Sequence, residues 1–193
     1  MNKKRKKQAK KIDILCNDFI GAQRDFIKSL KTISFVANFY ESIIGITELN
    51  SLLYNVVKLI KEENMETNVT FFLRQSNNFE LYMFESEQPI SLEKQHIEHS
   101  FTTELIDNIC KSNKICTLDD MFSMGLQGNL TGLNNISGVT IPLGQHGSSL
   151  GFILIFRSSD NKLSTEEINN ISSITCGLSR AIQCCHATQH LAD

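Results

Sequence analysis

The 193-residue sequence predicts an α+β domain, in which an antiparallel β-sheet lies between helices. Three observations predict this class. Alternating apolar residues at 137–143, a polar Gly-rich turn and an apolar run at 150–156 are typical of a β-hairpin. A second pair of β-rich segments lies at 69–74 and 79–84, separated by polar residues that suit a hairpin loop. Helical periodicity precedes and follows these segments, so the sheet occupies the middle of the sequence.

The second arm of the 137–156 hairpin is apolar on both of its alternating sets. Such a strand needs cover on both faces, so we expect it in the centre of the sheet, with helices above and below. Pro142 has no amide hydrogen, and its position must face an edge, a bulge or the strand end. The turn at 144–149 is too long for a two-residue loop. Its glycines, with Gly151, permit the positive φ angles that a longer loop or bulge needs.

The composition is that of an ordinary globular protein, with a formal net charge of -2 and 41% hydrophobic residues. We therefore expect no nucleic-acid partner. No apolar run approaches the ~20 residues of a membrane helix, so we expect no membrane partner. Residues 12–18 are too charged for the apolar part of a signal peptide, which predicts a cytoplasmic protein. The six scattered cysteines form no CxxC pair and are typical of small buried residues in a reducing compartment.

The chain divides into a basic leader at 1–11, a helix at 12–40 and a domain at 41–193 that includes a closing helix. We expect the leader to be disordered. A block of like charges can form a nuclear-localisation or nucleic-acid patch, and it can also form a solvated, frayed helix start. We favour the solvated interpretation, because no other segment carries matching basic charge.

A seven-residue repeat of apolar residues in the 12–40 helix predicts a coiled-coil seam, which a partner helix must cover. The alternative is an amphipathic helix that lies along its own domain. The closing helix, which begins after Ser164 and runs to about His190, has the same spacing. We therefore expect a homodimer through both helices. The first stripe comprises Ile12, Leu15, Phe19, Ala22, Phe26, Ile33, Val36 and Tyr40, and the second comprises Ile168, Ile171, Ile174, Leu178, Ala181, Ile182 and Cys185.

Between these ends the pattern predicts a helix at 47–64, a helix at 101–112, a short strand at 114–117 and a helix that begins at 118. We expect the polar segments at 85–100 and 124–135 to be irregular.

The order of these elements, with ICTLD at 115–119, GVTIPL at 138–143 and GFILI at 151–155, resembles the GAF domain over about residues 41–183. The resemblance implies an antiparallel sheet of five to six strands, with the terminal helices on one face and a small-molecule cavity on the other. It also implies a regulatory module for signal transduction, which binds a small effector and acts on a partner protein through its terminal helices. It leaves the cofactor unknown.

Strand parity gives a set of candidate ligand-binding residues for such a cavity, although a one-residue error of register would exchange the two faces. The apolar members can equally be core residues, and Asp119 can be a helix cap. The candidates are Phe72, Tyr82, Cys116, Asp119, Thr140 and Phe152.

Known activities of GAF-like proteins give two alternatives to a sensor. Stand-alone free methionine-R-sulfoxide reductases use reactive cysteines in pocket loops, and here only Cys110 and Cys116 lie in that half of the chain. The other alternative is a structural dimerisation adaptor without a ligand. Cys185 and His186 resemble a bilin-holding pair but lie in the closing helix, so we expect neither catalytic residues nor a bilin there. Cys184, Cys185, His186 and His190 could hold a metal, but we expect them to be packing or solvated residues.

Overall fold

The computed structural model of the chain describes residues 3–62, 64–75, 78–85, 97, 99–127, 136–145 and 148–192. Five strands form one antiparallel sheet in the order β2-β1-β5-β4-β3. The predicted α+β class and strand number are confirmed. In chain order the elements are α1 (Lys3–Ile43), α2 (Leu49–Lys61), β1 (Asn68–Gln75), β2 (Asn78–Phe84), α4 (Thr103–Ser112), β3 (Cys116–Thr117), α5 (Leu118–Ser123), β4 (Ile136–Gln145), β5 (Ser148–Ser158) and α7 (Thr165–Ala192).

Strand β5 occupies the centre of the sheet, as its two apolar faces predict. It pairs with β4 as far as Gln145 and Ser148, so the expected long turn is wrong, and the connection itself at 146–147 lies outside the described residues. A bulge follows Leu143, and Gly151 has a φ of 131°. A Cβ atom at Gly151 would lie 1.8 Å from the carbonyl oxygen of Phe72, so only glycine fits there.

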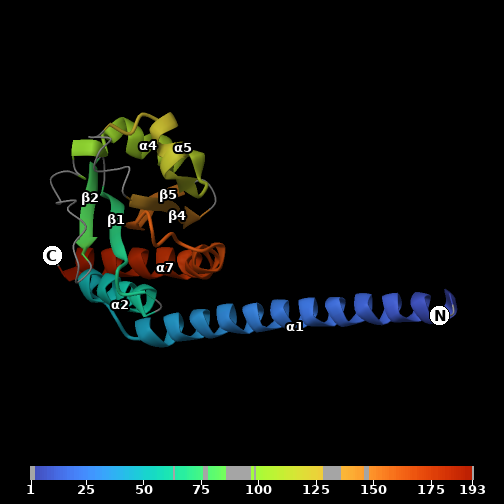
Figure 1. Ribbon diagram of the computed structural model, residues 1–193. Coiled ribbons are helices and arrows are strands. Elements are labelled where there is room, and N and C mark those ends of the chain that lie inside the picture. Colours follow the sequence, from blue (N-terminus) through green and yellow to red (C-terminus); the bar gives the residue numbers. More distant parts are fainter. Residues whose placement is uncertain are drawn as a thin grey trace.

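One face of the sheet packs against α2, α7 and the C-terminal part of α1 (Figure 1). Its core takes the odd-numbered residues of the central strands, such as Phe71, Ile141, Ile153 and Ile155. The opposite face is covered by α4 and α5. The domain thus has three layers, with helices above and below the sheet as predicted.

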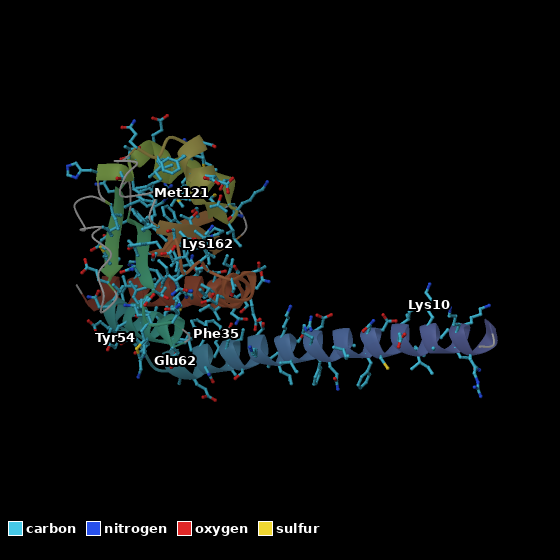
Figure 2. All side chains as sticks on the ribbon, in the orientation of Figure 1. Lys10, Phe35, Tyr54, Glu62, Met121 and Lys162 are labelled. Carbon is cyan, nitrogen blue, oxygen red and sulfur yellow. The ribbon has the colours of Figure 1, made fainter. Side chains whose placement is uncertain are left out.

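Helix α1 extends far beyond the domain, and its N-terminal end lies well away from the sheet (Figure 1). Figure 2 shows Phe35 where α1 meets the domain and Lys10 far out on the projecting part. The helix begins at Lys3, so residues 3–11 continue it and do not form the disordered leader that we expected. Side chains 5–20 are all exposed.

Helix α7 lies against α1 as well as against the sheet. Thr32 donates a hydrogen bond to Oδ1 of the buried Asn170 at 2.7 Å. Gly177 allows the two helices to approach closely, because a Cβ atom there would lie 2.7 Å from the Tyr40 hydroxyl and 3.0 Å from Cε1 of Phe39.

The apolar stripe of α7 is part of the domain's own core, with Ile174, Leu178 and Cys185 at most 1% exposed. Our expectation that this stripe forms an intermolecular seam is therefore wrong. The sheet of the same chain covers these side chains, which we expected a second copy to cover.

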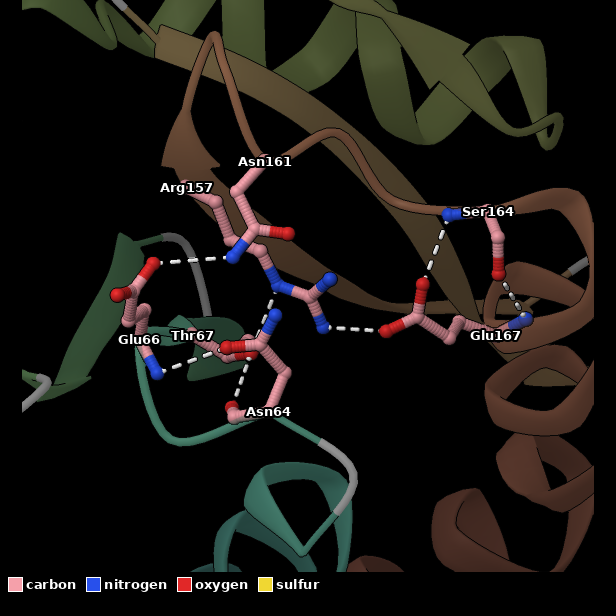
Figure 3. A network of polar contacts seen from close by, with 7 residues as sticks. All are labelled: Asn64, Glu66, Thr67, Arg157, Asn161, Ser164 and Glu167. Atoms are coloured by element: carbon pink, nitrogen blue, oxygen red, sulfur yellow. Dashed lines mark hydrogen bonds and ion pairs between the residues drawn. The ribbon is translucent and has the colours of Figure 1, made fainter.

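A buried arginine at the end of β5 joins three parts of the fold (Figure 3). Arg157 is 2% exposed and donates to Thr67 Oγ1 at 2.8 Å and to Glu167 Oε1 at 2.6 Å. Glu167 also accepts from the backbone amide of Ser164 at 2.8 Å, at the start of α7. Burial alone would raise the pKa of Glu167, but the hydrogen bonds from Arg157 and Ser164 hold that pKa below its ordinary value. This ion pair fixes the beginning of α7 to the sheet.

Candidate ligand-binding site

Three phenylalanine rings fill the middle of the sheet face under α4 and α5. Phe72 on β1 and Phe152 on β5 are directly paired, and their rings stack with centroids 4.6 Å apart. Phe101, just before α4, adds a third ring 5.0 Å from Phe72. The sequence placed the first two rings here, but we did not single out Phe101. Its position immediately before a helix N-cap, Thr102, was the available signal.

Four of the six predicted ligand-binding residues share this face. Phe72 and Phe152 lie in its aromatic cluster, and Cys116 belongs to the same buried group. Thr140 pairs with Cys116 across β3 and β4, and its hydroxyl donates to the Cys116 carbonyl at 3.5 Å. All four are nearly or fully buried.

Tyr82 lies on the opposite face of the sheet, against the helical layer of α2 and α7. Its partner across β1 and β2 is Phe71, which points to the same side. Burial, together with the nearby Glu80 carboxylate, raises the pKa of the Tyr82 hydroxyl. The prediction that Tyr82 lines the cavity with Phe72 is wrong, because β2 presents Leu81 and Met83 to that face instead.

Asp119 lies exposed in the first turn of α5 and is not part of the buried face. It is not the helix cap either. Thr117 is the N-cap, and Asp120 completes a capping box by accepting from the Thr117 backbone amide at 2.8 Å. The Thr117 hydroxyl also donates to the Asp120 carboxylate at 2.7 Å, and this bond, together with the one from the Thr117 amide, lowers the pKa of Asp120.

A cavity of about 20 Å³ opens beside the aromatic cluster. This volume is enough for about one water-sized molecule. No charged side chain is among the described residues of its wall, and only one is polar. The wall consists of Ile97, Ser100, Phe101, Leu118, Leu126, Ile136, Leu154 and Phe156.

The two cysteines of this half of the chain are both buried. Burial raises the pKa of the Cys110 thiol, although Ser149 and Arg74 nearby act in the opposite direction. The Cys116 sulfur lies 3.4 Å from both the Ser112 hydroxyl and the Lys114 carbonyl. A nucleophilic cysteine requires a stabilised thiolate, and the surroundings of Cys110 favour the neutral thiol.

No group of three metal-ligating side chains occurs among the described residues. In α7, Cys185 points into the core whereas Cys184 is exposed, so the two neighbours do not face one site. The side chain of His190 lies outside the described part of the chain.

The sheet order, the helices on its two faces and the position of the buried cluster define a GAF-like fold. The GAF domain of a phosphoenolpyruvate-protein phosphotransferase from Coxiella burnetii aligns with a TM-score of 0.60 and 13% identity, over 83% of this chain and 98% of that one. The GAF domain/HD domain protein from Geobacter sulfurreducens aligns with a TM-score of 0.57 and 14% identity, over 75% and 98% of the two chains. The GAF domain of the cyanobacteriochrome TePixJ aligns with a TM-score of 0.56 and 16% identity, over 75% of this chain and 94% of that one.

No protein-family model and no curated protein matches the sequence. The structural similarity therefore shows the fold, as the resemblance of the sequence implied. Among the described helices, none combines the length and apolar character that crossing a bilayer requires.

Proposed function

We propose that this chain is a cytoplasmic regulatory module of the GAF type, which binds a small molecule and acts on a partner protein as a homodimer. The dimer forms through α1. The GAF-like fold and the buried face under α4 and α5 support the ligand-binding part of this proposal. The projecting helix supports the dimer.

The exposed apolar stripe of α1 is the observation that carries the proposal. Ile12, Leu15, Phe19, Phe26 and Ile33 are each more than half exposed. They recur at seven-residue spacing, which is the pattern of a two-helix seam. A soluble monomer that presents such a row of large apolar side chains would lose the stabilisation that their burial provides.

Most of the stripe lies beyond the domain. Val36 and Tyr40, at its C-terminal end, lie against the core and Gly177 of α7, respectively, whereas the stripe residues from Ile12 to Ile33 are exposed. The domain therefore leaves the seam free for a second copy. Fully burying a large apolar side chain contributes about 1.5–3 kcal/mol, so ten of them in a dimer reach the ~4–15 kcal/mol that association costs.

Hydrogen bonds link the central hairpin, which contributes Phe152 and Thr140 to the proposed ligand face, to α7 and from there to α1. Gly144, at the end of the central hairpin, donates from its backbone amide to the Ser179 hydroxyl of α7 at 3.0 Å. Helix α7 in turn bonds to α1 through Asn170 and Thr32. A shift of the hairpin on ligand binding would be transmitted through α7 to α1 and to the partner protein.

A ligand-free adaptor is the second candidate. The Phe72, Phe101 and Phe152 rings already fill the middle of the face, and the cavity that the described residues form beside them is only about 20 Å³. A methionine sulfoxide reductase is less well supported, because Cys110 is buried and its pKa is raised.

Sedimentation equilibrium of the full chain tests the dimer. We expect a homodimer for the wild type and a monomer for Phe19→Glu/Phe26→Glu, which places carboxylates in the seam. The matched control, Asn17→Glu/Arg24→Glu, adds the same residues at exposed positions outside the stripe and should remain dimeric. A monomeric wild type at the highest concentration reached would overturn the proposal.

A further inference from the structure

A buried hydroxyl on the ligand-facing side of the sheet has no hydrogen-bond partner. Thr70 is fully buried in β1, and its Oγ1 is unpaired with any group in the described part of the chain. A buried polar group without a partner is destabilising, because it has lost its bonds to water. Such an atom in a folded domain requires an explanation.

Thr70 belongs to the face that carries the aromatic cluster. Strand residues alternate in direction, and its neighbours Val69 and Phe71 point into the helical layer. Across the sheet Thr70 is paired with Leu154, which lines the cavity, and Leu154 is paired with Thr140. Two threonines thus flank one cavity residue in a single row.

The hydroxyl of Thr140, in the same row, is only weakly hydrogen-bonded. The side chain of Thr140 is fully buried, and its hydrogen bond to the Cys116 carbonyl is long, at 3.5 Å. A neutral ligand with one polar group could therefore bond to either hydroxyl. The remaining surface of the face would contact only the apolar part of that ligand.

We propose that the ligand is a small neutral molecule with an apolar body and a single hydrogen-bonding group, which pairs with the Thr70 hydroxyl. This inference rests on the proposed ligand-binding function and narrows its chemistry. The cavity wall has no charged side chain among its described residues, and burial of an unpaired ionised group is strongly unfavourable. The described residues of this wall therefore offer no cation to pair with a carboxylate or a phosphate.

The ring of Phe101 is the part of the site that gives way to a ligand larger than one water. It is 8% exposed, compared with 3% for Phe72 and 0% for Phe152, and it lies outside the sheet. An apolar molecule of the size of a benzene ring would replace its contacts with Phe72. The cavity of about 20 Å³ beside it supplies the first part of the space.

Two variants test whether the Thr70 hydroxyl is unpaired, because we expect them to change the melting temperature in opposite directions. Thr70→Val keeps the shape and removes the unpaired oxygen, so we expect the melting temperature to rise by about 2–4 °C. Thr67→Val is the matched control, equally buried, whose hydroxyl accepts from Arg157 at 2.8 Å and donates to the Asn64 carbonyl at 2.7 Å. It should lower the melting temperature by about 2–4 °C. An equal fall in both variants would show that Thr70 is bonded within the protein and would overturn the inference.

Phenol, toluene and benzoate test the ligand chemistry, because they share one ring and differ in the polar group. We expect phenol to raise the melting temperature of the wild type more than toluene does, and benzoate to have no effect. In Thr70→Val the advantage of phenol over toluene should vanish. Equal shifts by phenol and toluene in the wild type, an advantage that survives in Thr70→Val, or no shift with either neutral probe would each contradict the proposed chemistry.

The same assay with cyclic GMP and biliverdin separates this inference from the proposed function. Stabilisation by either anionic compound, without stabilisation by phenol, would overturn the neutral-ligand inference and leave the regulatory function standing. A monomeric wild type in sedimentation would instead overturn the proposed dimeric module, whichever probe binds.

Discussion

Replacing Arg157 by leucine removes the buried cation that joins β5 to the start of α7. Glu167, whose side chain is 16% exposed, then loses the hydrogen bond of 2.6 Å that Arg157 donates to it. The Thr67 hydroxyl loses the hydrogen bond of 2.8 Å from the same arginine. Removing one partner of a buried ion pair typically costs about 3–5 kcal/mol, because the other charge is left unpaired. Glu167 keeps its bond from the Ser164 amide, so we expect a loss near the lower value, about 3 kcal/mol.

Urea unfolding followed by circular dichroism measures this loss. The matched control is Arg74→Leu, which breaks an ion pair of 3.0 Å to Asp107 whose side chains are 41% and 39% exposed. Exposed pairs contribute about 0–1 kcal/mol, so the control should lose far less stability. In a double-mutant cycle, Arg157→Leu/Glu167→Leu should be more stable than the sum of the single changes implies. Equal losses in Arg157→Leu and Arg74→Leu would refute the assignment of the buried pair as the fixing point of α7.

Three further changes have expected outcomes. The lowered pKa of Glu167 means that its ionised form stabilises the fold fully above its ordinary pKa of 4.5. That stability is lost as the pH falls through the lower folded-state pKa, so urea midpoints between about pH 6 and pH 3 should fall more steeply for wild type than for Glu167→Gln. Gly151→Ala should abolish folding, seen as loss of cooperative unfolding, because its Cβ would collide with the Phe72 carbonyl; a folded variant would contradict the register there. Gly21→Ala has open space and ordinary helical geometry, so it should stabilise α1 by about 1 kcal/mol, and no gain in helical circular dichroism or stability would argue against a helix at this position.

The central hairpin could be predicted from the sequence because its pattern has only one structural solution. A strand that is apolar on both faces must be covered twice, and β5 is the third of five strands. Pro142 also lies where its missing amide predicts. Among the described strands, the other neighbour of β4 is β3, which pairs with Val139 and Thr140 and ends before Pro142.

The partner of the α7 stripe could not be predicted from its spacing. A straight helix drifts only ~20° per seven residues from a seven-residue repeat, and a core-facing stripe is ~100° wide or more. Over 168–185 the two patterns are therefore indistinguishable. The structure shows that the sheet covers this stripe, whereas the corresponding stripe of α1 is exposed from Ile12 to Ile33.

The face of the sheet on which Tyr82 lies could not be predicted either, because both alternating sets of residues in β2 are largely apolar. The set with Phe79, Leu81 and Met83 is apolar throughout, whereas the set with Tyr82 includes Glu80, and this was the available signal. The buried polar residues were not predictable in the same way. The surroundings of Arg157 and Thr70 are set by residues that are distant in the sequence, Thr67 for Arg157 and Leu154 for Thr70.

Amide hydrogen exchange of residues 12–30, measured at protein concentrations far above and far below the dimer dissociation constant, tests the α1 seam most directly. An isolated helix without tertiary contacts is only marginally stable in water, whereas a helix in a dimer seam is protected. We expect strong protection at high concentration, its loss on dilution, and unchanged exchange in the sheet. Equal exchange of 12–30 at both concentrations would contradict the dimeric module.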